Sequence, residues 1–232
     1  MRRRILFLSV LMLALLAGVL LWRGDIAVPD RWNPWAPLDL RAPPNLLTGL
    51  KLARIKADPA LCRAVLATAG MSIRPVPDRE EAPGCAIEDA VAVSRSGVAF
   101  DRGFIASCRL AVAFALFERH ALQPAAEEAF GQRVAAVEHL GTYACRNVNH
   151  RAEGRRSRHA TADAIDLAAV RLADGRRITV ARGWAGDGPE ARFLRRLRDR
   201  ACRIFDVVLS PDYNAAHRDH LHLDVGWFGT CR

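Results

Sequence analysis

The stretch His220-Leu-His-Leu-Asp-Val225 alternates strictly between polar and apolar residues. A period of two is that of a β-strand, so His220, His222 and Asp224 point to one face while the aliphatic residues between them point to the other. The aliphatic face can pack into a core. The strand is therefore expected to present two imidazoles and a carboxylate on its second face.

A hairpin with a carboxylate of its own lies upstream. Residues 164–172 and 176–180 flank Ala173-Asp-Gly-Arg176, and Asp-Gly between two apolar-rich runs is a strong hairpin signal. The same alternation sets Asp166 between two alanines on one face and Ile165 and Leu167 on the other. The small neighbours leave room beside the carboxylate for something bulkier than a side chain.

The remaining segments predict helices around these strands. Residues 50–70 indicate two short helices, residues 107–122 a helix that stops near Gln123-Pro124, and residues 134–139 a strand. Pro189-Glu190 opens a helix whose apolar positions follow the helical period: 193, 194, 197, 201, 204 and 205. We expect fold class α+β, with a small antiparallel sheet flanked by helices.

The N-terminal 23 residues predict a membrane anchor. Three arginines precede an uncharged apolar run of 18 residues, from Ile5 to Trp22, which is just long enough to cross a bilayer. The basic residues should stay in the cytoplasm, so the rest of the chain would be exported. A cleaved signal peptide is the competing interpretation, although its apolar region is usually shorter and no clear small-x-small site precedes Arg23.

Residues 24–50 differ in composition from the rest of the chain. They contain five prolines and two tryptophans and have no sustained period, which predicts a stiff, extended tether. Residues 51–232 then form the folded domain. All six cysteines lie there, at positions 62, 85, 108, 145, 202 and 231. In an exported domain they favour three disulfides of undetermined pairing, and free buried thiols are the alternative if the chain is not exported.

The net charge of +9 comes almost entirely from arginine. It suggests anionic surroundings such as phospholipid, cell-wall polymer or nucleic acid. The densest patches are residues 151–158 and 192–200, and neither is interleaved with the aromatic residues that base stacking needs, so we expect no nucleic-acid binding. The second patch is equally consistent with a solvated basic helix face.

Two histidines and a carboxylate on separate elements are the ligand set of a catalytic zinc, with a fourth position left for water. Imidazole nitrogen and carboxylate oxygen suit Zn²⁺, and the chain has no Cys-x-x-Cys pair for a closed structural site. Such a zinc activates a water and polarises a carbonyl, and hydrolysis of an amide is its natural use.

The residues that carry these groups resemble known motifs. Ser157-x-His159-x-x-x-x-Ala164-x-Asp166 is similar to the Ser-x-His-x-x-Gly-x-Ala-x-Asp motif of the D-Ala-D-Ala metallopeptidases, with Ala162 in place of the glycine. The segment 217–222 resembles the His-x-x-His-x-His of zinc D-Ala-D-Ala carboxypeptidases and penicillin-insensitive murein endopeptidases. Over roughly residues 55–232 the chain looks closer still to the bacterial extensin-like C-terminal domain family.

The resemblance implies a D-Ala-D-Ala metallopeptidase-like fold in which His159, Asp166 and His222 bind zinc. It implies that His220 is the general base or stabilises the tetrahedral intermediate, with His217 in support. Relatives often carry a glutamate at the position of His217, so the choice between the two histidines stays open.

Two further residues receive site roles. Arg146 would hold a substrate carboxylate or an oxyanion, and Ser157 would form a hydrogen bond within the loop that sets His159. No function is assigned to His120, His139 or His150.

We therefore expect a zinc peptidase-like domain that is held on the inner membrane, faces the periplasm and hydrolyses stem peptides or cross-links of peptidoglycan. The alternative is a non-catalytic cell-wall-binding or scaffold protein that keeps the zinc for structure. Secretion after signal cleavage is the alternative localisation. The sequence identifies no protein partner.

Overall fold

The computed structural model describes residues 2–23, 27–226 and 229–232. Met1, residues 24–26 of the expected tether and residues 227–228 of the expected domain lie outside the described residues.

A nine-stranded sheet organises the described part of the domain. Its strands are β1 (Ser72–Val76), β4 (Ala90–Arg95), β5 (Ala99–Ser107), β6 (Val134–His139), β7 (Ala164–Leu172), β8 (Arg177–Thr179), β9 (Val207–Leu209), β10 (Leu221–Asp224) and β11 (Thr230–Cys231). The order is β1-β4-β5-β6-β7-β10-β9-β11, with β8 paired to β7. Neighbours are antiparallel except β5 beside β6 and β9 beside β11. The predicted class α+β is confirmed, but the sheet is larger than expected.

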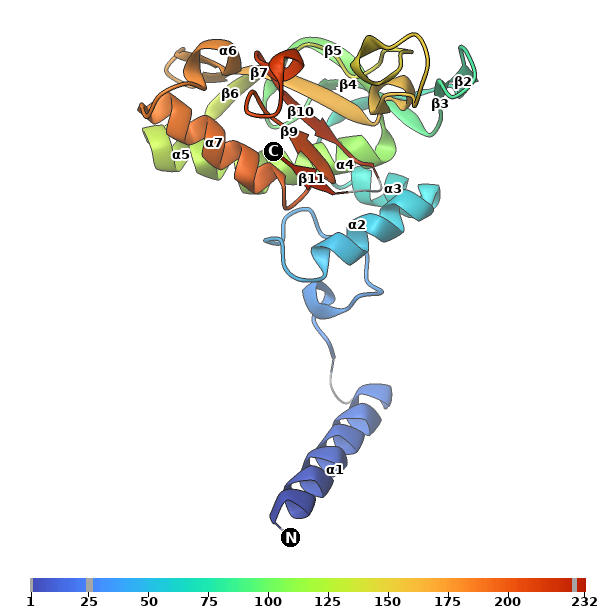
Figure 1. Ribbon diagram of the computed structural model, residues 1–232. Coiled ribbons are helices and arrows are strands. Elements are labelled where there is room, and N and C mark those ends of the chain that lie inside the picture. Colours follow the sequence, from blue (N-terminus) through green and yellow to red (C-terminus); the bar gives the residue numbers. More distant parts are fainter. Residues whose placement is uncertain (1, 24–26, 227–228) are drawn as a thin grey trace.

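Helices gather on one side of this sheet (Figure 1). They are α2 (Thr48–Ala57), α3 (Pro59–Leu66), α4 (Cys108–Phe117), α5 (Gln123–Phe130) and α7 (Pro189–Ala201), with the single turn α6 (Val180–Gly183) after β8. A continuous apolar core lies between helices and sheet, and Leu221, Leu223, Ile165 and Leu167 belong to it as the alternation predicts. The polar residues between them therefore face away from the core.

The strands between residues 72 and 107 account for the larger sheet. Strand β1 is mostly exposed, and the short hairpin of β2 (Arg79–Glu80) and β3 (Ala86–Ile87) separates it from its partner β4. A strand at a sheet edge needs no buried face, so its sequence carries little alternation. Strand β5 ends at Ser107, whose hydroxyl caps α4 by accepting a hydrogen bond from the backbone N–H of Leu110.

The predicted end of the helix near Pro124 is wrong. Helix α4 continues through a π-turn, Glu118–Leu122, directly into α5. In this wider turn the N–H of Gln123 bonds to the carbonyl of Glu118, five residues earlier. A proline lacks an N–H and clashes with a regular α-turn behind it, and the π-turn lets the helical path continue past Pro124.

The segment expected to be an extended tether is partly folded onto the domain. Leu38 and Leu40 join the apolar core, and the ammonium of Lys51 donates a hydrogen bond to the carbonyl of Asp30 over 2.7 Å. A 3-10 turn, Asp30–Trp32, and the start of α2 at Thr48 also fall within residues 24–50. Short apolar stretches between prolines are invisible to a periodicity argument, so this packing could not be predicted.

Three disulfides pair all six cysteines, as the exported interpretation requires: Cys62–Cys108, Cys85–Cys145 and Cys202–Cys231. The first joins α3 to α4. The second ties the end of the β2–β3 connection to the segment before the first motif, and the third ties the end of α7 to β11. Such bridges are typical of extracytoplasmic domains.

Helix α1 (Arg2–Trp22) has the length and composition of a signal anchor or a membrane span. Within the described residues it is the one helix that does, and none of its apolar window is buried against the rest of the protein. Figure 1 shows it projecting from the domain on the side of α2.

Candidate metal centre

A cleft of about 770 Å³ opens on the face of β7 and β10 that turns away from the core. Its lining includes Asp166, His222, His217 and His220, together with arginines from residues 146–158. The alternation predicted a polar face for each segment, with His220 and His222 on one and Asp166 on the other, and the pairing of β7 with β10 brings the two faces together. The cleft is where the polar faces of the two strands meet the loops that precede them.

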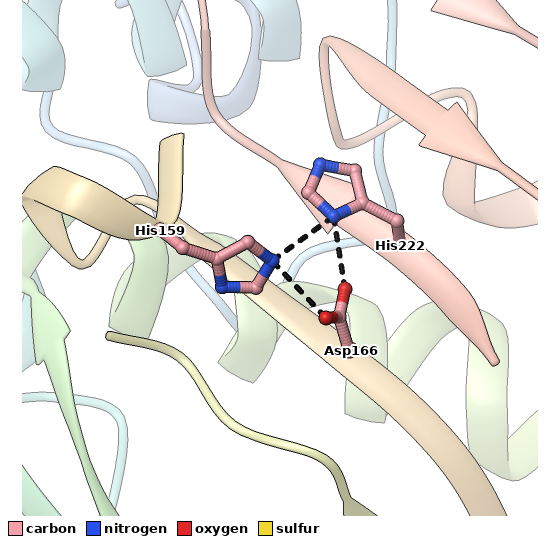
Figure 2. Close-up of side chains that lie close together, drawn as sticks. All are labelled: His159, Asp166 and His222. Atoms are coloured by element: carbon pink, nitrogen blue, oxygen red, sulfur yellow. Dashed lines mark hydrogen bonds and ion pairs between the residues drawn. The ribbon is translucent and has the colours of Figure 1, made fainter. Parts of the chain in front are cut away.

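His159, Asp166 and His222 point toward one another in the cleft (Figure 2). The Nε2 atom of His159 lies 3.1 Å from Asp166 Oδ2 and 3.2 Å from His222 Nδ1, and His222 Nδ1 lies 2.9 Å from Asp166 Oδ1. One ligating atom from each residue falls within 4.8 Å of the others. The structure thus brings together the three residues that the motifs predict as metal ligands.

The pairing of β7 with β10 positions two of the three candidate ligands, Asp166 and His222. In the antiparallel register of β7 and β10, His222 stands directly opposite Asp166. Residues opposite each other in such a pair have Cβ atoms about 4.5–5.5 Å apart and project to the same face. A slip of one residue in either strand would send one of the two side chains into the core.

His159 reaches the site from a 3-10 turn, Arg158–Thr161, that ends in a strained residue. Ser157 caps the turn, and its Oγ accepts a hydrogen bond from the N–H of His159 over 3.3 Å. Ala162 follows with φ of +53°, in the left-handed region, which costs about 1–2 kcal/mol for a residue with a Cβ. This is the position where the similar motif carries glycine.

Asp163 holds this turn in place. Its carboxylate is fully buried and receives two hydrogen bonds from Arg109, at 2.7 and 2.5 Å, and one each from the hydroxyls of Ser107 and Thr161. The role of Asp163 was not predicted, although the residue stands inside the first motif.

The imidazoles of His159 and His222 each have an inner nitrogen that faces Asp166 and an outer nitrogen that points away from it. The outer nitrogens are also hydrogen-bonded. His159 Nδ1 donates to the carbonyl of Thr142 over 3.2 Å, and His222 Nε2 donates to Asp224 Oδ2 over 3.2 Å. Because these partners can only accept, the outer nitrogens carry the protons. The inner nitrogens then turn lone pairs toward Asp166, which is the arrangement that histidine ligands of metals adopt. The alternation placed Asp224 on this face, but its part in orienting His222 was not foreseen.

Two lone pairs and a carboxylate that face each other at about 3 Å require a positive charge between them. In the metal-free protein a proton supplies it. Burial lowers the pKa of His222, but its hydrogen bonds with Asp166 and Asp224 outweigh burial and raise that pKa to about 9. Burial likewise favours the neutral acid of Asp166, but the hydrogen bonds and charges of His159 and His222 hold its pKa well below the usual range.

Two more histidines stand at the rim of the cluster. His220 Nδ1 lies 2.9 Å from Asp219 Oδ1, and its Nε2 lies 3.5 Å from Asp166 Oδ1. His217, in the turn Ala215–His217, donates from Nδ1 to Asn214 Oδ1 over 2.8 Å. Burial, helped by the nearby charges of His222 and His220, lowers the pKa of His217 to about 4, so its ring is neutral at pH 7.

The other sequence candidates fall into two groups. Arg146 is half-buried in the cleft lining, and its guanidinium has no hydrogen-bond acceptor or ion-pair partner among the described residues. His150 also borders the cleft, whereas His120 bonds to the carbonyl of Leu40 and His139 lies in the core beside Phe104. The structure gives His120 and His139 no place near the cluster.

The donor set fits zinc by its chemistry: two imidazole nitrogens and one carboxylate oxygen, with no thiolate and no fourth ligand converging among the described residues. Residues 60–232 match the sequence model of the family described as Extensin-like protein C-terminus. No curated protein and no solved structure matches the chain.

Proposed function

The chain belongs to the extensin-like C-terminus family, and from its cleft we propose that it is a zinc-dependent peptidase that hydrolyses peptide bonds of peptidoglycan stem peptides or cross-links. The observation that carries the proposal is the convergence of two imidazole lone pairs and a carboxylate at the wall of an open cleft. The likeness of the two motifs to those of the D-Ala-D-Ala metallopeptidases supports it.

His159, Asp166 and His222 would hold the zinc, through Nε2, a carboxylate oxygen and Nδ1 respectively. A zinc with an open position lowers the pKa of its water towards about 7 and polarises a carbonyl oxygen. Thr142 and Asp224 fix the orientation of the two rings, so the ligands need little rearrangement to bind.

His220 and His217 are the candidates for proton transfer. Each has its Nδ1 hydrogen-bonded to a side-chain oxygen, which leaves Nε2 to take a proton from the attacking water and pass it to the leaving amine. We assign the base to His220, because its Nε2 lies 3.5 Å from a carboxylate oxygen of Asp166, and give His217 the supporting role. Arg146 would hold a substrate carboxylate or the developing oxyanion.

The N-terminal helix suggests where the reaction takes place. With α1 in the inner membrane and its arginines in the cytoplasm, the disulfide-bonded domain would face the periplasm and its peptidoglycan. Cleavage of α1 as a signal would leave the same domain secreted.

Muropeptide analysis tests the proposal. Zinc-loaded full-length protein in detergent micelles is incubated with purified sacculi, and the soluble products are separated by liquid chromatography and mass spectrometry. We expect shortened stem peptides or separated cross-links from the wild type and none from Asp166→Asn. Asp199→Asn, the same change on the exposed face of α7, should act as the wild type does.

Unchanged muropeptides with zinc bound would overturn the peptidase proposal. If that protein still sedimented with sacculi, the result would support a non-catalytic cell-wall-binding domain.

A further inference from the structure

Residues 146–158, which include the arginine-rich patch 151–158, form a closed loop beside the cleft, here called the arginine loop. The N–H of Val148 donates to the carbonyl of Arg155, and the N–H of Ser157 donates to the carbonyl of Arg146, each over 3.0 Å. The side-chain amide of Asn147 donates to two carbonyls within the loop. The two ends of the loop are thus held together at the mouth of the cleft.

Contacts outside the loop fix its base. Cys145, immediately before it, is bonded to Cys85. Arg156 extends across to the same segment, where its Nε donates to the carbonyl of Pro83 over 3.0 Å and its side chain packs on Gly84. A Cβ at Gly84 would lie 3.0 Å from the Arg156 side chain, so the close approach depends on glycine. Arg156 therefore has a structural role, because its guanidinium is already hydrogen-bonded within the protein.

Three other arginines of the loop have no such hydrogen bonds among the described residues. Arg146, Arg155 and Arg158 all line the cleft, and no acceptor for any of their guanidinium groups is found among the described residues. On the sheet and on α7, by contrast, arginines share carboxylates: Arg171 and Arg177 bind Glu138, and Arg196 and Arg200 bind Glu128.

Among the described residues that line the cleft, no carboxylate forms an ion pair with these arginines. The acidic lining residues are Asp166 and Asp224, and both already bind His222. Glu153, the acidic residue of the loop, lines a neighbouring hollow that Arg155 also borders, but no ion pair or hydrogen bond joins these two side chains. Arg158 is half-buried, which raises the cost of leaving it without a counter-charge.

We propose that Arg155 and Arg158 bind an internal carboxylate of the substrate peptide, remote from the bond that is cut. The inference rests on the proposed function and narrows it to peptides that carry a carboxylate away from the bond that is cut. A planar guanidinium matches a carboxylate with two parallel hydrogen bonds. The cleft volume of about 770 Å³ suits a peptide of a few residues rather than a polymer chain.

A binding measurement tests this without turnover. Full-length protein is stripped of metal with a chelator and titrated calorimetrically with a synthetic stem tetrapeptide whose internal carboxylates are either free or amidated. We expect the wild type to bind the free form at least about tenfold more tightly, the size of one charge-assisted hydrogen bond. Arg155→Gln and Arg158→Gln should each remove most of that difference, and Arg158→Lys should restore part of it.

Arg151→Gln is the matched control. Arg151 lies on the same loop and carries the same charge, but it lines the neighbouring hollow and not the cleft. Its loss should leave the preference for the free carboxylate unchanged.

Three results would overturn the inference: equal binding of free and amidated peptides, an equal loss in Arg151→Gln, or tighter binding of a phosphate-bearing wall polymer than of the peptide. None of them depends on hydrolysis. A protein that cleaves no peptide but keeps the carboxylate preference would refute the proposed function and leave only the binding of a peptide carboxylate by Arg155 and Arg158.

Discussion

Asp163 and Asp166 stand three residues apart in one motif, and the protein balances their charges in opposite ways. Asp163 is 0% exposed and faces Arg109, a permanent cation, with two hydroxyls completing its hydrogen bonds. Asp166 is 8% exposed and faces two imidazoles whose inner nitrogens are acceptors when neutral. One carboxylate is balanced by the protein itself, and the other needs a proton or a metal.

The difference separates a structural acid from a ligand. A carboxylate whose cation is part of the fold stabilises the native state at all times. A carboxylate whose cation must come from solution stabilises it in proportion to the concentration of that cation. Buried charge alone therefore does not identify a functional acid, and the nature of its partner does.

The largest expected effect is the loss of Asp163. Asp163→Ala leaves the guanidinium of Arg109 without its partner, and breaking a buried ion pair from one side costs about 3–5 kcal/mol. We expect urea unfolding of the metal-free protein to show a loss of that size. Asp166→Ala should lose clearly less under the same conditions, because no permanent cation is left behind. Equal losses would remove the distinction between the two acids.

Zinc should narrow the difference in stability loss between the Asp163 and Asp166 variants. At free zinc of 100 times the dissociation constant, binding to the native state alone raises the free energy of unfolding by about 2.7 kcal/mol. We expect this gain in the wild type and its absence in Asp166→Asn, His159→Ala and His222→Ala, as measured by thermal or urea unfolding with disulfides kept oxidised. His120→Gln, outside the cleft, should retain the gain, and stabilisation of all three site variants would place the metal elsewhere.

Replacing the proposed base should separate chemistry from binding. His220→Ala is expected to keep its zinc while hydrolysis of a stem peptide falls by about 100-fold, as for other positioned proton-transfer groups. Elemental analysis and product formation are followed on the same samples. Full activity in His220→Ala would transfer the role to His217. Loss of zinc from His220→Ala with zinc kept in His222→Ala would exchange the ligand and the base.

Asp224 should have a smaller influence through His222. Asp224→Asn weakens the hydrogen bond that sets the His222 ring, and loss of such a partner typically lowers metal affinity about 10- to 100-fold. Competition with a zinc chelator measures the change. An affinity equal to that of the wild type would mean that strand geometry alone orients the ring.

Sequence periodicity predicted the part of the site that lies on regular strands. His222 and Asp166 fall on polar faces of β10 and β7 because Leu221, Leu223, Ile165 and Leu167 are drawn into the core. The pairing of the two strands could not be predicted from either one alone. The register depends on contacts between segments more than fifty residues apart in the chain.

The contrast between Asp163 and Asp166 could not be predicted from the sequence, for a different reason. Arg109, which decides the role of Asp163, lies more than fifty residues earlier on α4 and reaches it only in the folded protein. The disulfide partners and the packing of Leu38 and Leu40 are long-range in the same sense. Local sequence patterns predict which face of a helix or strand is polar. They do not predict which residues of another element contact that face.

The central claim is that His159, Asp166 and His222 bind one zinc ion, and anomalous X-ray diffraction from crystals of the zinc-loaded protein tests it most directly. Data collected on either side of the zinc absorption edge should give one strong difference peak, bonded to His159 Nε2, His222 Nδ1 and a carboxylate oxygen of Asp166. Asp163 should remain bound to Arg109 in the same crystals. A zinc peak at other residues, or no peak from protein equilibrated with excess zinc, would contradict the account.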